Sequence, residues 1–194
     1  MKYKKGQTMK KLFKPLAIVS LIGLIGLTLS SVSQAESMAP KAVERINVQQ
    51  YMGKWYEIAH LPMYFQRKCV GDTTAQYSLN ADQSITVLNR CRTASGKMDT
   101  AEGIAYAQNS GNSQLKVSFL PKGLRWLPFT KGDYWVLRID PEYKVALVGG
   151  PSDKYLWILS KTPNLDQATY QSYLETARQY GYDISKVVKT PQPH

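Results

Sequence analysis

Tyr51-Met52-Gly53-Lys54-Trp55-Tyr56-Glu57-Ile58-Ala59 is the stretch around which the rest of the chain is organised. Gly53 stands two residues before Trp55, and the residues that follow favour an extended strand. Glycine permits a close approach or an unusual backbone angle at this point. The tryptophan would place a large apolar ring at the first inward position of that strand. We therefore expect a first strand here whose beginning, at Gly53 and Trp55, closes the base of a barrel.

Segments of β-prone sequence follow at nearly even spacing, separated by short turns. We expect strands over residues 54–60, 73–79, 84–91, 101–107, 114–120, 133–139, 145–149 and 155–161. A helix should follow Pro163 and end at Gly181, because Tyr170, Tyr173, Leu174 and Ala177 share one face. Short connections favour closure, which removes the exposed edges of an open sheet. The expected fold is all-β: an eight-stranded up-and-down antiparallel β-barrel with a C-terminal α-helix packed on its outside.

The first 35 residues have the layout of a secretory signal peptide. Lys10, Lys11 and Lys14 precede an apolar run over 16–29, which ends in small residues at Ser33-Gln34-Ala35. The run is shorter than the roughly 20 residues that a membrane-spanning helix needs. Met9 is a second candidate start. We expect a signal peptide over 1–35, an N-terminal arm over 36–47 and one domain over 48–194.

Charge argues against nucleic acid as a partner. The chain carries 25 Lys+Arg and 14 Asp+Glu, but six of the lysines and none of the acids lie in the leader. The remainder has 19 basic and 14 acidic residues, a modest excess. Such a protein could still favour an anionic membrane surface.

Cys69 and Cys91 are the two cysteines of the chain. In an oxidising compartment they predict one disulfide, and the strand order places both at the open end of the barrel. Their spacing fits neither a metal site nor a redox pair. Closing a loop of about 22 residues would stabilise the fold by roughly 3 kcal/mol.

Three ordered motifs resemble those of the lipocalins, in the branch with the bacterial (Blc-like) and apolipoprotein D-like members. The motifs are Gly53-x-Trp55 with Tyr56-Glu57-Ile58-Ala59, the segment from Tyr134 through Asp140 to Tyr143, and Tyr155 to Pro163. Lys161 stands where this branch usually has an arginine lying across the tryptophan. Lysine keeps the cation–π contact but loses the planar fork of donors. The resemblance covers about residues 46–190 and implies binding of lipids such as fatty acids or lysophospholipids.

Many bacterial members of that family are lipoproteins, and this sequence departs from them. No cysteine stands near the expected cleavage site at Ala35, so the leader lacks the residue that lipidation requires. We expect an exported, soluble, periplasmic protein, a monomer or a homodimer. Peripheral association with the outer membrane is the alternative.

Strand alternation, with Trp55 inside, assigns candidate ligand-binding positions to the barrel interior. They are Glu57, Ala59, Ala75, Tyr77, Val87, Asn89, Val117, Phe119, Trp135, Leu137, Tyr155 and Trp157. Small residues among them would leave room that a solid core does not tolerate. Glu57 would meet a ligand headgroup, or be hydrogen-bonded within the wall or protonated by burial. Trp135 and Trp157 would be pocket walls or core filler.

The two ends of the barrel have different candidate roles. Gly53, Trp55 and Lys161 would close the base. Two apolar loops, containing Met63, Tyr64 and Phe65 and then Trp126 and Phe129, would crown the mouth beside basic residues. Exposed apolar clusters of this kind would dock transiently on a membrane, cover the ligand, or pack on one another as a lid.

The sequence thus favours a carrier of a small hydrophobic ligand, serving envelope lipid transport or storage. A lipocalin-fold enzyme acting on a hydrophobic substrate is one alternative, but the chain has only two histidines, His60 and His194, and His60 has outward parity. Phosphate loops, the serine-hydrolase elbow and metal-ligand clusters do not occur in the sequence, so no cofactor and no metal is expected. A structural envelope protein with a filled barrel is the other alternative.

Overall fold

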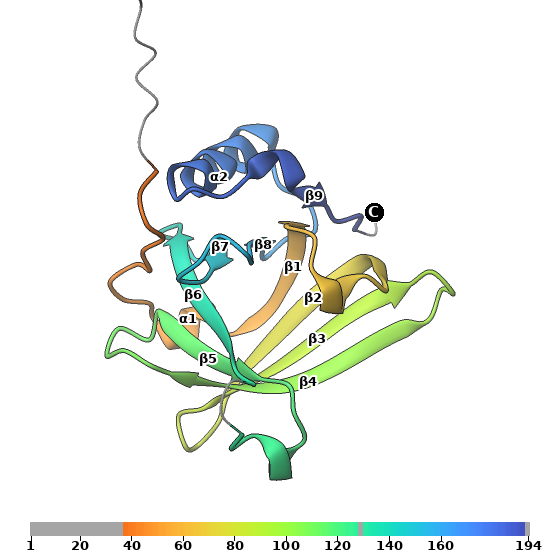
Figure 1. Ribbon diagram of the computed structural model, residues 1–194, viewed down its shortest axis with the longest axis vertical. Coiled ribbons are helices and arrows are strands. Elements are labelled where there is room, and N and C mark those ends of the chain that lie inside the picture. Colours follow the sequence, from red (N-terminus) through yellow and green to blue (C-terminus); the bar gives the residue numbers. More distant parts are fainter. Residues whose placement is uncertain (1–36, 128–129, 193–194) are drawn as a thin grey trace, which may run out of the picture. The chain divides into compact units, whose positions relative to one another are not determined.

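The computed structural model describes residues 37–127 and 130–192, whose strands form one continuous antiparallel sheet (Figure 1). The expected signal peptide lies outside the described residues. In chain order the elements are α1 (Val48–Tyr51), β1 (Gly53–His60), η1 (Tyr64–Gln66), β2 (Cys69–Leu79), β3 (Ile85–Thr93), β4 (Met98–Ala107), β5 (Gln114–Ser118), η2 (Lys122–Leu124), β6 (Gly132–Ile139), β7 (Val145–Gly149), β8 (Trp157–Ser160), α2 (Gln167–Gln179), η3 (Ile184–Lys186) and β9 (Val188–Lys189).

The strands β1 to β8 form the expected closed up-and-down barrel. Each strand from β2 to β7 pairs with its successor, β8 pairs with β1, and β1 closes the cylinder by pairing with β2. The closing contact runs from Gly53 opposite Tyr77 to Tyr56 opposite Thr74. Beyond Tyr56 the two strands no longer pair, and the C-terminal segment enters the wall there.

The backbone at the start of β1 shows why a glycine is needed. Gly53 has φ +93°, a conformation that L side chains rarely adopt. This angle turns the chain from α1, which crosses the base, into the first strand. Asn47 caps α1 by accepting a hydrogen bond from the Gln50 amide through its side chain.

Helix α2 lies over β7 and β8 on the outside of the barrel, as Figure 1 shows. Asp166 caps its N-terminus by accepting from the Thr169 amide at 2.9 Å, and Gly181, at φ +81°, follows its C-terminus. The expected apolar face is buried: Tyr170, Tyr173, Leu174 and Ala177.

Apolar side chains gather in two separate cores. The inner core fills the lower barrel around Trp55, Tyr77, Val87 and Val117. The outer core lies between the barrel wall and α2, and contains Leu137, Leu147, Leu156 and Ile158 with the buried face of the helix. The wall beneath α2 is therefore apolar on both of its faces. In that part of the barrel, the pattern of apolar and polar residues does not distinguish inward from outward side chains.

The segment before α1 is fixed by backbone hydrogen bonds. The amide of Met38 donates to Gln179 at the end of α2, Val43 donates to Val136, and Ile46 donates to Gly111. Within the residues that the structure describes, no helix has both the length and the apolar character needed to cross a membrane.

Candidate functional site

The upper interior of the barrel is lined by two rows of side chains at neighbouring heights. Register places Tyr77, Val87 and Gly103 in one row, and Ala75, Asn89 and Ala101 in the next row toward the mouth. The upper row is made of small or slender residues, which fill less of the space inside the barrel. Ala101 is exposed although it faces inward. The lumen is therefore accessible to solvent at this height.

Two aromatic side chains border the same space. Phe119, just beyond β5, rests against Gly103, because a methyl group placed on that glycine would lie only 2.8 Å from the Phe119 ring. Phe119 remains 47% exposed. Trp157, facing inward at the top of β8, is also only partly buried. An interior lined by apolar side chains, with small residues in its upper row, is suited to binding an apolar ligand.

Two β-bulges overturn three of the expected inward positions. The β6–β7 register shifts between Val136 and Arg138, and the β1–β8 register shifts between Glu57 and Ala59. Trp135, Leu137 and Ala59 consequently pack in the outer core, not in the interior. A bulge adds one residue to one strand and so reverses the alternation beyond it.

Tyr134 and Val136 occupy the inner positions of β6 instead. The remaining inward assignments for Ala75, Tyr77, Val87, Asn89, Val117 and Trp157 agree with the register and the inner core. Tyr155 precedes β8 and is 40% exposed at the rim, where its ring stacks on Trp157 with centroids 6.3 Å apart.

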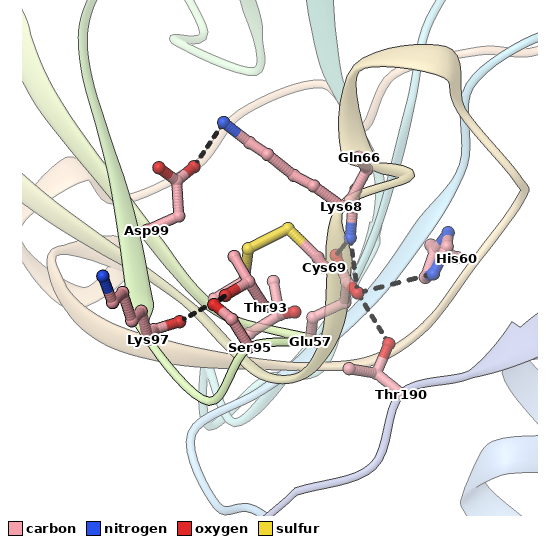
Figure 2. The surroundings of a disulfide bond; sticks show 12 residues. Glu57, His60, Gln66, Lys68, Cys69, Thr93, Ser95, Lys97, Asp99 and Thr190 are labelled. Carbon is pink, nitrogen blue, oxygen red and sulfur yellow. Dashed lines mark hydrogen bonds and ion pairs between the residues drawn. A yellow bond between two sulfur atoms is a disulfide. The ribbon is translucent and has the colours of Figure 1, made fainter.

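A polar cluster lies beneath the mouth, centred on the Glu57 carboxylate (Figure 2). Gln66 Nε2 donates to both carboxylate oxygens, at 2.8 and 2.6 Å, and Thr190 Oγ1 donates to Oε1 at 2.6 Å. Gln66 Oε1 lies 3.4 Å from the Trp157 indole nitrogen, which donates to it. Glu57 is 4% exposed, so the wall itself satisfies the carboxylate.

His60 belongs to this cluster, contrary to the outward parity expected for it. The bulge in β1 places it opposite Trp157, and its Nε2 lies 3.8 Å from Glu57 Oε1. His60 Nδ1 donates to the Leu61 carbonyl at 2.7 Å. Burial raises the pKa of Glu57, while His60, Thr190 and Gln66 oppose that rise.

The C-terminal segment completes the wall where β1 and β2 separate. Strand β9 pairs with Ala59 and His60, and the Thr190 amide donates to the Ile58 carbonyl. On the other side, the Asp72 amide donates to the Pro191 carbonyl at 2.8 Å. The Gln192 amide group bridges both strands by donating to the carbonyls of Glu57 and Thr73. Sequence reasoning missed this strap (residues 188–192), because two residues of strand carry no periodicity.

The base is sealed as the sequence indicated. Lys161 Nζ lies 4.2 Å from the centre of the Trp55 ring and donates to the Met52 carbonyl at 2.6 Å. Trp55, fully buried, donates its indole N–H to the Tyr51 carbonyl at 2.8 Å. Burial lowers the pKa of Lys161. Lysine thus retains the cation–π contact expected at this position.

Above the base, three tyrosine hydroxyls form a chain that the sequence did not reveal. Tyr134 Oη lies 2.7 Å from Tyr51 Oη and 2.9 Å from Tyr77 Oη. Burial is the main cause that raises the pKa of all three hydroxyls. These are the polar groups at the floor of an otherwise apolar space.

The mouth loops expose several large apolar residues. Tyr64 is 79% and Trp126 74% exposed, and Phe65 and Leu124 also face solvent. Met63 was expected among them but is buried, at 4% exposure, and anchors its loop. Phe129 lies outside the described residues. Tyr64, Phe65, Arg67 and Lys68 border an open hollow of about 520 Å³.

The predicted disulfide is present between Cys69 and Cys91, with Cα atoms 5.5 Å apart (Figure 2). It links the mouth ends of β2 and β3. Beside it, Lys68 forms an ion pair with Asp99 at 2.5 Å. Across residues 37–127 and 130–192, no three His, Cys, Asp or Glu side chains come together in a way that could hold a metal ion.

Known proteins resemble this chain both in amino-acid sequence and in fold. The model of the lipocalin-like domain matches residues 46–192. Temperature-induced lipocalin-1 of Arabidopsis thaliana is 49% identical over 160 residues, covering 81% of this chain and 85% of that protein. The outer membrane lipoprotein Blc of Vibrio cholerae is 35% identical over 187 residues, covering 95% and 99%.

Two further matches, one in sequence and one in structure, have lower sequence identity. Mouse apolipoprotein D is 31% identical over 163 residues, covering 79% of this chain and 81% of its own. Among solved structures, insecticyanin from the tobacco hornworm Manduca sexta superposes with a TM-score of 0.64 at 20% identity, covering 82% of this chain and 88% of that one.

Proposed function

The chain belongs to the lipocalin family, and from that premise we propose that it is an exported carrier of a small hydrophobic ligand held in the barrel. Fatty acids and lysophospholipids are the ligand classes we favour, and envelope lipid transport or storage is the role. The curated relatives bear lipocalin, lipoprotein and apolipoprotein names, and Blc is named as an outer membrane lipoprotein. Binding, and not catalysis, is the activity we assign.

The observation that carries this proposal is the accessible, apolar upper lumen. Ala101 and Phe119 are exposed although they face into the barrel, and Trp157 is only partly buried. Burying that surface against a ligand contributes about 25 cal/mol for each Å² removed from water. A filled structural barrel would leave no such surface on its inner wall.

Mass spectrometry of organic extracts tests the proposal without choosing a ligand in advance. The protein is exported and purified without detergent, and its extract is compared with that of a variant whose lumen is filled, Ala101→Trp. We expect a lipid in stoichiometric amount with the wild type and its loss from the variant. Equal lipid recovery from both proteins would contradict storage in the lumen.

We also propose that the mouth loops dock on an anionic membrane surface. Tyr64, Phe65 and Trp126 would enter the headgroup region, while Arg67 beside them would pair with lipid phosphates. We expect Trp126→Asp to reduce flotation with anionic vesicles. Met38→Asp, which changes an exposed methionine on the N-terminal arm, is the matched control. Equal flotation of the Trp126 variant and wild type would remove the docking proposal.

A further inference from the structure

The hydroxyl chain of Tyr51, Tyr134 and Tyr77 contains one hydrogen more than its hydrogen bonds use. Its two contacts, of 2.7 and 2.9 Å, each consume one hydroxyl hydrogen, whereas three hydroxyls supply three. Within the described part of the chain, these hydroxyls make no other hydrogen bond. One donor is therefore left over, whichever way the chain is oriented. A buried donor without an acceptor is costly, so a partner from outside the protein is favoured there.

The surplus donor lies at the floor of the lumen. Tyr77 belongs to the inner row with Val87 and Gly103, and Tyr134 faces inward opposite Leu115. Tyr51 extends from α1 beneath them, and the centroid of its ring lies 4.9 Å from that of Trp55. Tyr51 and Tyr77 are buried, whereas Tyr134 keeps some accessible surface. The leading end of a ligand that enters through the mouth would therefore meet this group of three hydroxyls, the tyrosine floor.

The charged groups around the tyrosine floor favour a neutral hydrogen-bond acceptor on the ligand over a carboxylate. Among the described residues, no lysine or arginine occupies an inward-facing strand position, and the Lys161 ammonium is held at the base by the Trp55 ring and the Met52 carbonyl. An anion at the tyrosine floor would therefore have no cation paired with it. The charge of Glu57 acts on the same region, since it contributes to the raised pKa of Tyr77. All three hydroxyls stay protonated at physiological pH because burial raises their pKa values, so the surplus hydrogen is always present.

We propose that the tyrosine floor is a polar subsite that binds a neutral hydrogen-bond acceptor, such as a ketone, ester or hydroxyl oxygen, at the deepest end of an apolar ligand. The inference rests on the proposed carrier function and narrows its ligand class. The preferred ligand has an apolar body and an oxygen near the end that enters first. A plain acyl chain would fill the space but leave the donor unpaired.

The test compares pairs of fatty acids over a series of chain lengths. Each pair consists of an unsubstituted acid and the acid of equal length with a ketone next to its terminal methyl group. Dissociation constants are measured by titration calorimetry for the wild type and for the triple variant Tyr51→Phe/Tyr77→Phe/Tyr134→Phe. All three hydroxyls must be removed, because two hydroxyls that share one bond would still have a spare hydrogen.

The preference for the keto acid is the dissociation constant of the plain acid divided by that of the keto acid. At the chain length that reaches the floor, we expect this ratio to be about tenfold lower in the triple variant than in the wild type. Tyr173→Phe is the control: its hydroxyl donates to the Val145 carbonyl in the outer core, at 2.9 Å, away from the lumen. This control should keep the preference of the wild type. An unchanged preference in a folded triple variant would overturn the subsite.

The wild type alone provides a second test if the triple variant does not fold. Its preference for the keto acid should appear at a limited range of lengths and vanish when the ketone is moved to the middle of the chain. Equal affinity for keto and plain acids at every length would mean that the floor holds water only, and the inference would fail while the carrier function stands. Binding of neither acid would overturn both.

Discussion

At the scale of the residue, Glu57 is the charged group that the barrel wall has to accommodate. It is 4% exposed and accepts hydrogen bonds from Gln66 and Thr190, which belong to a mouth loop and to the C-terminal strap. One carboxylate therefore links three separate parts of the chain. These contacts favour a role for Glu57 in holding the barrel wall together over a role in contacting the ligand.

The raised pKa of Glu57 makes stability depend on pH with a definite sign. Between its ordinary value of 4.5 and the raised value, the folded protein holds a proton that the unfolded chain has released. The stabilisation from this group is full below 4.5 and is lost as pH rises through that window.

Urea unfolding across this window measures the effect directly. The free energy of unfolding of the wild type, relative to that of Glu57→Gln, should fall as pH rises. Glu102→Gln, which removes an exposed carboxylate on β4, is the control for the loss of one acidic group. His60 and Tyr77, the titratable groups near the carboxylate, are unchanged in both variants. A relative stability that rises with pH, or stays flat, would refute the assignment.

At the scale of the element, the strap at residues 188–192 takes the place of a missing strand contact. Removing residues 188–194 should lower the free energy of unfolding and expose the edge of β2. The Asp72 amide, which donates to Pro191, should then exchange its hydrogen faster. The Asn80 amide, which donates to Ser84 at a distant turn, is the internal control. Unchanged protection of Asp72 would show that the strap does not hold the wall.

The disulfide makes a separate contribution at the mouth ends of β2 and β3. Its residues are 22 apart in sequence, so removing the crosslink with Cys69→Ala/Cys91→Ala should cost roughly 3 kcal/mol by loop-closure entropy. Chemical denaturation measures the loss, and circular dichroism should show that the barrel persists. An unchanged unfolding midpoint would mean that the crosslink constrains little in the unfolded chain.

Alternation predicts inner and outer faces only where the two faces differ in polarity. On β2 and β3 the outer face meets water, and the expected positions of Ala75, Tyr77 and Val87 agree with the register. Beneath α2 both faces are apolar, so the pattern carried no information about Trp135 and Leu137, and the bulge in β6 reversed them. Hydrogen bonds between distant segments, such as Gln66 to Glu57, have no local signature in the sequence.

At the scale of the whole molecule, the fold followed from the sequence because many weak local signals agreed. Strand spacing, turn residues, the Gly53-x-Trp55 start and the amphipathic helix all favoured one closed barrel with an external helix, and that arrangement is confirmed. The base was also predictable, since Trp55 and Lys161 belong to ordered motifs. The tyrosine floor was not, because alternation with Trp135 inside puts Tyr134 on the outer face.

The central claim is that the lumen holds the ligand, and titration of a fatty acid into two matched variants tests it most directly. Ala101 faces inward and its neighbour Thr100 faces outward on β4, and both are exposed. Calorimetry should show that Ala101→Trp weakens binding at least tenfold, whereas Thr100→Trp binds like the wild type. Equal affinity of the two variants would place the ligand outside the barrel and contradict the account.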